Sequence, residues 1–191
     1  EEARAVGAVV HRELERLARA GLPARALPTS DRRWRGELLR EGLPQQLLPG
    51  AEARIAEALE RVAGSATAAR LLDPAAEEAE SELALTAELD GSLVRVRIDR
   101  SFVDGEGVRW IVDWKTGTHS GGGLEEFLAQ ELERYGPQLA RYSRVLALYD
   151  GRPQRLGLYF PLLDRFVEWT SPAAAPSMAS SSGAGTGRPN R

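Results

Sequence analysis

Residues 110–117, Trp-Ile-Val-Asp-Trp-Lys-Thr-Gly, constrain the fold more than any other part of this chain. The stretch is typical of a short apolar strand that ends in two charged residues and a glycine-containing turn. Strand side chains alternate between two faces, which predicts a buried apolar face made of Trp110, Val112 and Trp114. The opposite face would carry Ile111, Asp113 and Lys115. The strand therefore presents a carboxylate and an ammonium on one side, where both can reach one reacting group.

Lys115 is the single lysine among 25 lysine and arginine residues. Lysine is a compact charge whose pKa can shift with its surroundings, whereas arginine stays charged and spreads its charge over a plane. A lysine kept in a chain that otherwise uses arginine favours a chemical role. An isolated D-x-K pair is more often a surface ion pair, so the rest of the chain must decide between the two interpretations.

Composition limits the possible classes of protein. A chain of 191 residues with 42% hydrophobic and 28% charged residues is typical of one globular domain with extensions. The absence of cysteine excludes disulfides, thiol nucleophiles and iron–sulfur clusters. No apolar run reaches the roughly 18–20 residues that span a bilayer, and no secretory signal is visible, so we expect a cytoplasmic protein without membrane contact. A net charge of −3 gives no overall attraction to nucleic acid.

Periodicity and turn residues predict the order of the elements. Helices are expected at 1–20, 35–40, 50–72 and 75–79, then from 124 to 135, and again from residue 137 after a break at Gly136-Pro137. Strands are expected at 82–89, 93–103, 110–115, 156–160 and 165–170. We therefore expect a domain over residues 1–170, with a mainly helical part at 1–80 and a sheet core with helices at 81–170. The Ser-, Ala- and Gly-rich residues 171–191 are expected to be a disordered tail, and the chain to be a fragment of a longer protein.

The turn at residues 90–92 makes the first two strands a hairpin, and the turn at residues 104–107 returns the chain as the third strand of an antiparallel meander. Asp99 and Asp113 therefore come from adjacent strands. Two such carboxylates can share a divalent cation, and oxygen ligands favour Mg²⁺ or Mn²⁺. The carbonyl of Trp114 could add an oxygen. His11, on the first helix, could add a nitrogen or could be a half-buried, hydrogen-bonded histidine. Gly7, one turn before His11, leaves space above it for a ligand or another backbone.

Residues 32–35, Arg-Arg-Trp-Arg, form a basic cluster around an aromatic residue. The cluster could contact phosphates while Trp34 stacks on a base. A solvated arginine-rich loop is the commoner alternative.

Four motifs follow one another at residues 7–15, 98–100, 111–117 and 135–142. They are a helix with Gly and His, an Ile-Asp at a strand end, the D-W-K-T-G strand, and Q-L-A-R-Y on a helix. In this order they resemble the RecB-type nucleases of the PD-(D/E)XK superfamily. More narrowly, they resemble the C-terminal nuclease domain of bacterial RecB and AddA helicase–nucleases.

The resemblance implies an α/β, restriction-endonuclease-like core in which helices flank a central mixed sheet. It implies catalytic roles for Asp99, Asp113 and Lys115. It implies a metal site, with ligands from His11, Asp99, Asp113 and Trp114. Support of the site or contact with DNA is expected from Tyr135, Gln138 and Tyr142. Arg97 departs from the small residue common at its position, and could crowd the metal or contact a phosphate.

The function implied is a Mg²⁺- or Mn²⁺-dependent deoxyribonuclease, exonuclease rather than endonuclease, in double-strand-break repair and recombination. Such a domain would share its parent chain with a helicase, bind a partner subunit, and act in the bacterial cytoplasm on single strands or unwound duplex ends. The absence of cysteine argues against the branches with an iron–sulfur cluster. One alternative is a catalytically inactive nuclease fold that binds DNA or protein. The other is an interaction domain whose Asp–Lys pair is structural.

Overall fold

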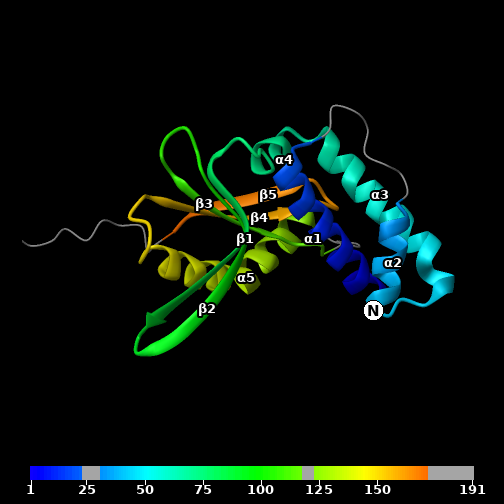
Figure 1. The fold of residues 1–191 in the computed structure, drawn as a ribbon, viewed down its shortest axis with the longest axis horizontal. Coiled ribbons are helices and arrows are strands. Elements are labelled where there is room, and N and C mark those ends of the chain that lie inside the picture. The colour runs from blue at the N-terminus through cyan, green and yellow to red at the C-terminus, as the bar shows by residue number, and fades with distance from the viewer. Residues whose placement is uncertain (23–30, 118–122, 172–191) are drawn as a thin grey trace, which may run out of the picture.

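The computed structural model describes residues 1–22, 31–117 and 123–171 (Figure 1). The α-helices are α1 (Glu2–Ala20), α2 (Arg32–Arg40), α3 (Leu48–Gly64), α4 (Ala66–Leu71) and α5 (Leu124–Leu146), and a 3-10 turn, η1, spans Gln45–Leu47. The strands are β1 (Glu77–Leu89), β2 (Ser92–Val103), β3 (Arg109–Trp114), β4 (Gln154–Phe160) and β5 (Arg165–Thr170).

The five strands form one sheet in the order β1-β2-β3-β4-β5. Neighbours are antiparallel except β3 and β4, which run parallel and are joined through α5. A parallel pair needs such a crossover, because a tight turn cannot return the chain to the starting edge. The predicted α/β fold with a central mixed sheet and flanking helices is confirmed.

Helices cover both faces of the sheet, and the two largest hydrophobic clusters of the described residues lie between the layers (Figure 1). One cluster joins α1–α4 to the buried side chains of Phe102, Trp110, Val112, Trp114 and Tyr159. The other joins α5 to Ile98, Ile111, Leu156, Leu158 and Phe160. Successive β3 residues enter opposite clusters, as the period of two predicts. The end of β3 therefore lies between the α1 layer and α5.

Two turns fix the register of the first three strands. Asp90 and Gly91 have φ of 52° and 75°, the left-handed pair typical of a type I′ hairpin, and pair Leu89 with Ser92. In the next turn, Asp104 accepts hydrogen bonds from the backbone of residues 106 and 108 and from Trp110 Nε1. These turns carry β2 and β3 back alongside each other.

Three of the predicted helices are wrong. α5 continues through Pro137, because Leu128 and Leu139 on either side pack into one cluster and offset the one missing N–H bond. The predicted helix at 50–72 is two helices, since Ser65 leaves helical geometry and its Oγ caps α4. The predicted helical turn at 75–79 is largely the start of β1.

At the C-terminal end, Ser171 is not part of a tail but buried, with its Oγ 2.5 Å from that of Ser143. Residues 172–191 lie outside the described part. Among the described residues, no helix combines the length and apolar character required to cross a membrane.

Candidate active site

The candidate site lies where β2 and β3 separate. Their last ladder pair is Arg100 with Val112. Beyond it, the Trp114 backbone N–H donates to Asp99 Oδ2 at 2.8 Å instead of to a strand carbonyl. The side chain of Asp99 thus satisfies a backbone donor that the diverging strands would leave unpaired.

Asp113 and Lys115 form a close pair at the end of β3. Lys115 Nζ lies 2.6 Å from Asp113 Oδ2, and the side chains are 18% and 5% exposed. The Lys115 ammonium therefore offsets the negative charge of this buried carboxylate. Lys115 Nζ also lies 3.8 Å from the centre of the Tyr135 ring, a cation–π contact that orients the ammonium. The predicted shared face of Asp113 and Lys115 is therefore present.

Burial raises the pKa of Asp113 to about 6, and the nearby negative charge of Asp99 adds to the rise. The ammonium of Lys115 and the imidazole of His11 act in the opposite direction without cancelling it. A carboxylate whose ionised form is disfavoured gains most from a further positive charge. Perturbed groups of this kind concentrate at functional sites.

His11 reaches the same place from α1. Its Nε2 lies 3.1 Å from Asp99 Oδ2, and its Nδ1 lies 3.7 Å from Glu82 Oε1. The hydrogen bond with Asp99 raises the pKa of His11, and burial opposes this rise. The long reach from residue 11 to the strand carboxylate, which the sequence could not establish, is thus observed.

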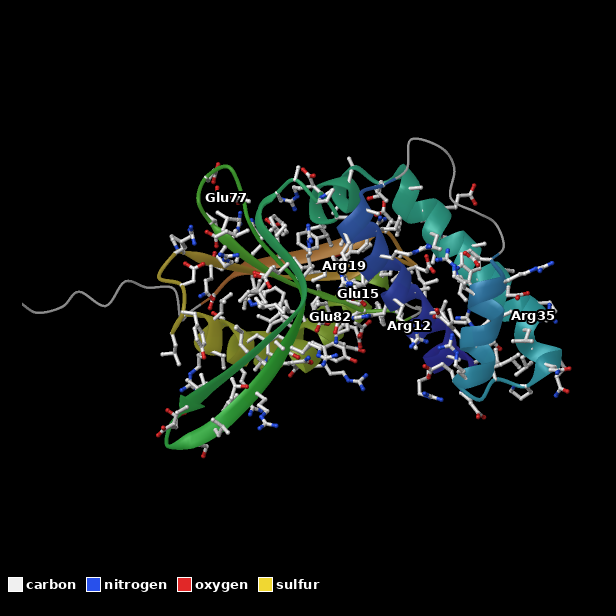
Figure 2. The ribbon with its side chains drawn as sticks, in the orientation of Figure 1. Arg12, Glu15, Arg19, Arg35, Glu77 and Glu82 are labelled. Carbon is white, nitrogen blue, oxygen red and sulfur yellow. The ribbon has the colours of Figure 1, made fainter. Side chains whose placement is uncertain are left out.

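Glu82 lies in the candidate site, and the sequence analysis missed it. Potential ligand atoms of His11, Glu82 and Asp99 all lie within 4.8 Å of one another. Figure 2 shows Glu82 on β1 next to α1. Its φ of 56° is unusual for a residue other than glycine, and such backbone conformations occur preferentially at functional sites. The signal was in the hairpin register: with Leu89 opposite Ser92, counting back along both strands places Glu82 opposite Asp99.

Gly7 joins α1 to the end of β3. A Cβ atom at this position would lie 2.4 Å from Thr116 Oγ1, well inside van der Waals contact. The space expected above Gly7 is therefore filled by the threonine of the D-W-K-T-G motif. This close approach lets α1 bring His11, one turn later, to the strand carboxylates.

The family model described as the PD-(D/E)XK nuclease superfamily matches residues 1–176. The chain belongs to the PD-(D/E)XK nuclease superfamily. No curated protein matches the chain. The five-stranded mixed sheet with helices on both faces agrees with the restriction-endonuclease-like fold of this superfamily.

Superfamily nucleases typically use divalent metals, and two observations fit such an ion here. The first is the group of His11, Glu82 and Asp99, since atoms bound to one ion at about 2.0–2.6 Å lie within about 5 Å of one another. The second is the buried carboxylate of Asp113, whose ionised form is disfavoured by burial and by the charge of Asp99. Asp113 is outside the group of three.

The remaining predicted site residues surround these carboxylates. Gln138 Nε2 donates to the Tyr142 hydroxyl at 2.5 Å on one face of α5, and burial raises the pKa of Tyr142. Arg97 does not crowd the site: its side chain is 71% exposed and donates to Glu82 Oε2 at 3.2 Å. The indole of Trp114 is buried against Tyr159, so only its backbone faces the carboxylates.

The basic cluster at residues 32–35 is not a stacking platform. These residues begin α2, and Trp34 is completely buried in the cluster that joins α1 to α3. The interpretation of Trp34 as a base-stacking residue is therefore wrong. Trp34 and Leu38 are four residues apart and therefore lie on one face of the helix. This apolar spacing marks Trp34 as a core residue.

Proposed function

We propose that this superfamily member is a metal-dependent deoxyribonuclease that hydrolyses phosphodiester bonds. The observation that carries the proposal is the buried Asp113–Lys115 pair beside Asp99. A surface ion pair would be solvated and would leave the carboxyl pKa low. Here the carboxyl is buried, its pKa is raised, and a second carboxylate lies nearby.

The proposed ligands are His11, Asp99 and Asp113, with Glu82 and the Trp114 carbonyl as further oxygen donors. This oxygen-rich set suits Mg²⁺, and the imidazole suits Mn²⁺ better. A cation bound there supplies Lewis acidity toward the phosphate and lowers the pKa of a bound water.

Lys115 is proposed to orient the attacking water or to stabilise charge that develops on the phosphate. Its position is held by the Tyr135 ring and by its backbone N–H, which donates to the Tyr159 carbonyl at 2.8 Å. The Gln138–Tyr142 pair on α5 supports this side of the site. These contacts fix the ammonium in advance, so little reorganisation is needed during the reaction.

The order of the four motifs further supports a RecB- or AddA-type exonuclease domain, in a parent chain with a helicase and with a partner subunit. Its substrates would be single strands or unwound duplex ends during double-strand-break repair. An inactive nuclease fold is the alternative. The joint presence of His11, Asp99, Asp113 and Lys115 favours the active enzyme, because an inactive descendant is free to lose any of them.

The test is degradation of end-labelled single- and double-stranded DNA with Mg²⁺, with Mn²⁺ and with chelator. We expect cleavage only with metal, and products that shorten progressively from one end. Binding of DNA without cleavage under all metal conditions would favour the inactive alternative. A linear duplex and a closed circle of the same sequence distinguish exonuclease from endonuclease cleavage. An exonuclease needs a free end and does not cut the circle.

A further inference from the structure

The β1–β2 hairpin has an outer face that no described residue covers. Along β2, the even positions are buried under α5: Val94, Val96 and Ile98. The odd positions are exposed on the opposite side: Leu93, Arg95 and Arg97. The same odd row continues into Asp99 at the candidate site. One strand therefore carries an apolar side chain and two cations in a line toward the proposed metal.

The neighbouring strand leaves this line open. The register pairs Arg97 with Ala84 and Arg95 with Thr86, and both small side chains are exposed. The single carboxylate of this outer face near the tip is Glu88, opposite Leu93. Because Ala84 and Thr86 are small, no bulky side chain stands beside the arginines, and an extended polymer could lie along them.

Both arginines have donors available for a ligand. Arg95 makes no hydrogen bond or ion pair with another described residue. Arg97 makes one ion pair with a described residue, Glu82, and its side chain remains 71% exposed. Elsewhere the hairpin is braced from its inner side, where Arg144 pairs with Asp90 at 2.8 Å. The charged row is therefore presented on a supported strand.

From this geometry we infer that the outer face of the β1–β2 hairpin is a binding track for one strand of nucleic acid that ends at Asp99. The inference rests on the proposed nuclease function and assigns the path of its substrate. Alternate residues of a strand lie about 7 Å apart, so Arg95 and Arg97 can contact neighbouring phosphates of an extended strand. Leu93 at the tip offers an apolar contact for a base or sugar. A single line of cations suits the one phosphate backbone of a single strand, whereas a duplex would present two phosphate backbones.

The test uses Arg95→Ala, with Arg35→Ala as the matched control. Arg35 is also exposed, makes no hydrogen bond or ion pair with another described residue, and lies on α2 away from the hairpin (Figure 2). Both changes are placed in an Asp113→Asn background, so that DNA is not consumed. Binding of a labelled single strand of about 20 nucleotides is followed by fluorescence anisotropy at several salt concentrations.

We expect Arg95→Ala to weaken binding several-fold and to reduce the slope of log K against log salt by about 0.7, the value for one lost phosphate contact. Arg35→Ala should change neither quantity. Equal behaviour of the two variants would overturn the track, and so would a loss confined to blunt duplex.

A cleavage assay of Arg95→Ala in a protein that retains Asp113 distinguishes failure of this inference from failure of the proposed function. Arg95→Ala should raise KM for the long strand and leave cleavage of a trinucleotide, which is too short to occupy the track, unchanged. Normal cleavage of both substrates by the variant would overturn the track alone. If the parent protein binds the strand through Arg95 but cleaves neither substrate with any metal, the proposed function fails and the binding surface stands.

Discussion

The two halves of the candidate site are built in different ways. Asp113 and Lys115 are two residues apart on one strand, and Asp113 is almost completely buried. His11, Glu82 and Asp99 come from three separate elements and are 14–29% exposed. The strand pair can therefore be predicted from local sequence, and burial raises the pKa of its carboxylate to about 6. The group of three depends on the tertiary fold and is the more accessible to an ion from solvent.

The largest expected effect concerns the buried half. Asp113→Asn should lower metal-dependent DNA cleavage by about 1000-fold, because it removes a proposed ligand and the partner of Lys115. Its Tm should be equal to or higher than that of the wild type, since an uncharged amide replaces a carboxylate whose ionised form is disfavoured. Asp90→Asn at the hairpin turn is a suitable control. Retained activity in Asp113→Asn would refute the assignment of the site.

Lys115→Ala tests whether the second member of the pair acts in the chemical step. We expect about a 100-fold lower rate with a much smaller change in DNA affinity, because the ammonium stabilises charge that develops during the reaction. Single-turnover rates and binding isotherms on the same oligonucleotide measure the two effects. Equal losses in rate and affinity would instead make Lys115 a phosphate clamp.

Glu82→Gln tests the accessible half. The change keeps the shape of the side chain and removes its charge, so we expect Mn²⁺ affinity to fall about tenfold. Isothermal titration calorimetry gives the affinity directly. Glu80→Gln, an exposed β1 neighbour, should leave the affinity unchanged. If both variants bind Mn²⁺ like the wild type, Glu82 serves only to hold His11 and Arg97.

Gly7→Ala tests the junction between the two halves. The added methyl group would press on Thr116, so the free energy of unfolding should fall by about 1–3 kcal/mol. Gly36→Ala is the matched control, since Gly36 is also helical but has open space around it. That variant should gain about 0.5–1 kcal/mol from its higher helix propensity. Chemical denaturation of both variants measures the difference, and equal stability changes would show that α1 does not depend on the Thr116 contact.

The smallest expected effect is on pH dependence. The folded-state pKa of Asp113 is raised to about 6, so below that pH a proton occupies the carboxylate that the metal needs. When the pH is lowered from 7.5 to 5.5, protonation of Asp113 alone should weaken Mn²⁺ binding by about fourfold. The raised pKa of His11 acts in the same direction, because a protonated imidazole cannot bind metal. Affinity that is flat over this range would show that neither group is a ligand.

The sequence predicted what depends on periodicity and failed where packing decides. The strand alternation of Trp110–Trp114 and the hairpin turn at Asp90 were predictable because each is set by a few neighbouring residues. The continuity of α5 through Pro137 was not, because apolar contacts on both sides outweigh the local break. Glu82 was missed for a related reason: its role depends on the carboxylate opposite it and on a helix far away in the sequence.

The position of His11 has a thermodynamic consequence for folding. One ligand of the proposed ion lies on the first helix and the others on the sheet, so an ion would act as a cross-link between segments distant in the chain. Binding at a concentration 100 times Kd stabilises the bound state by about 2.7 kcal/mol. That energy would resist separation of α1 from β1 and β2. Slower amide hydrogen exchange in α1 on addition of Mn²⁺ would report this coupling without any measurement of cleavage.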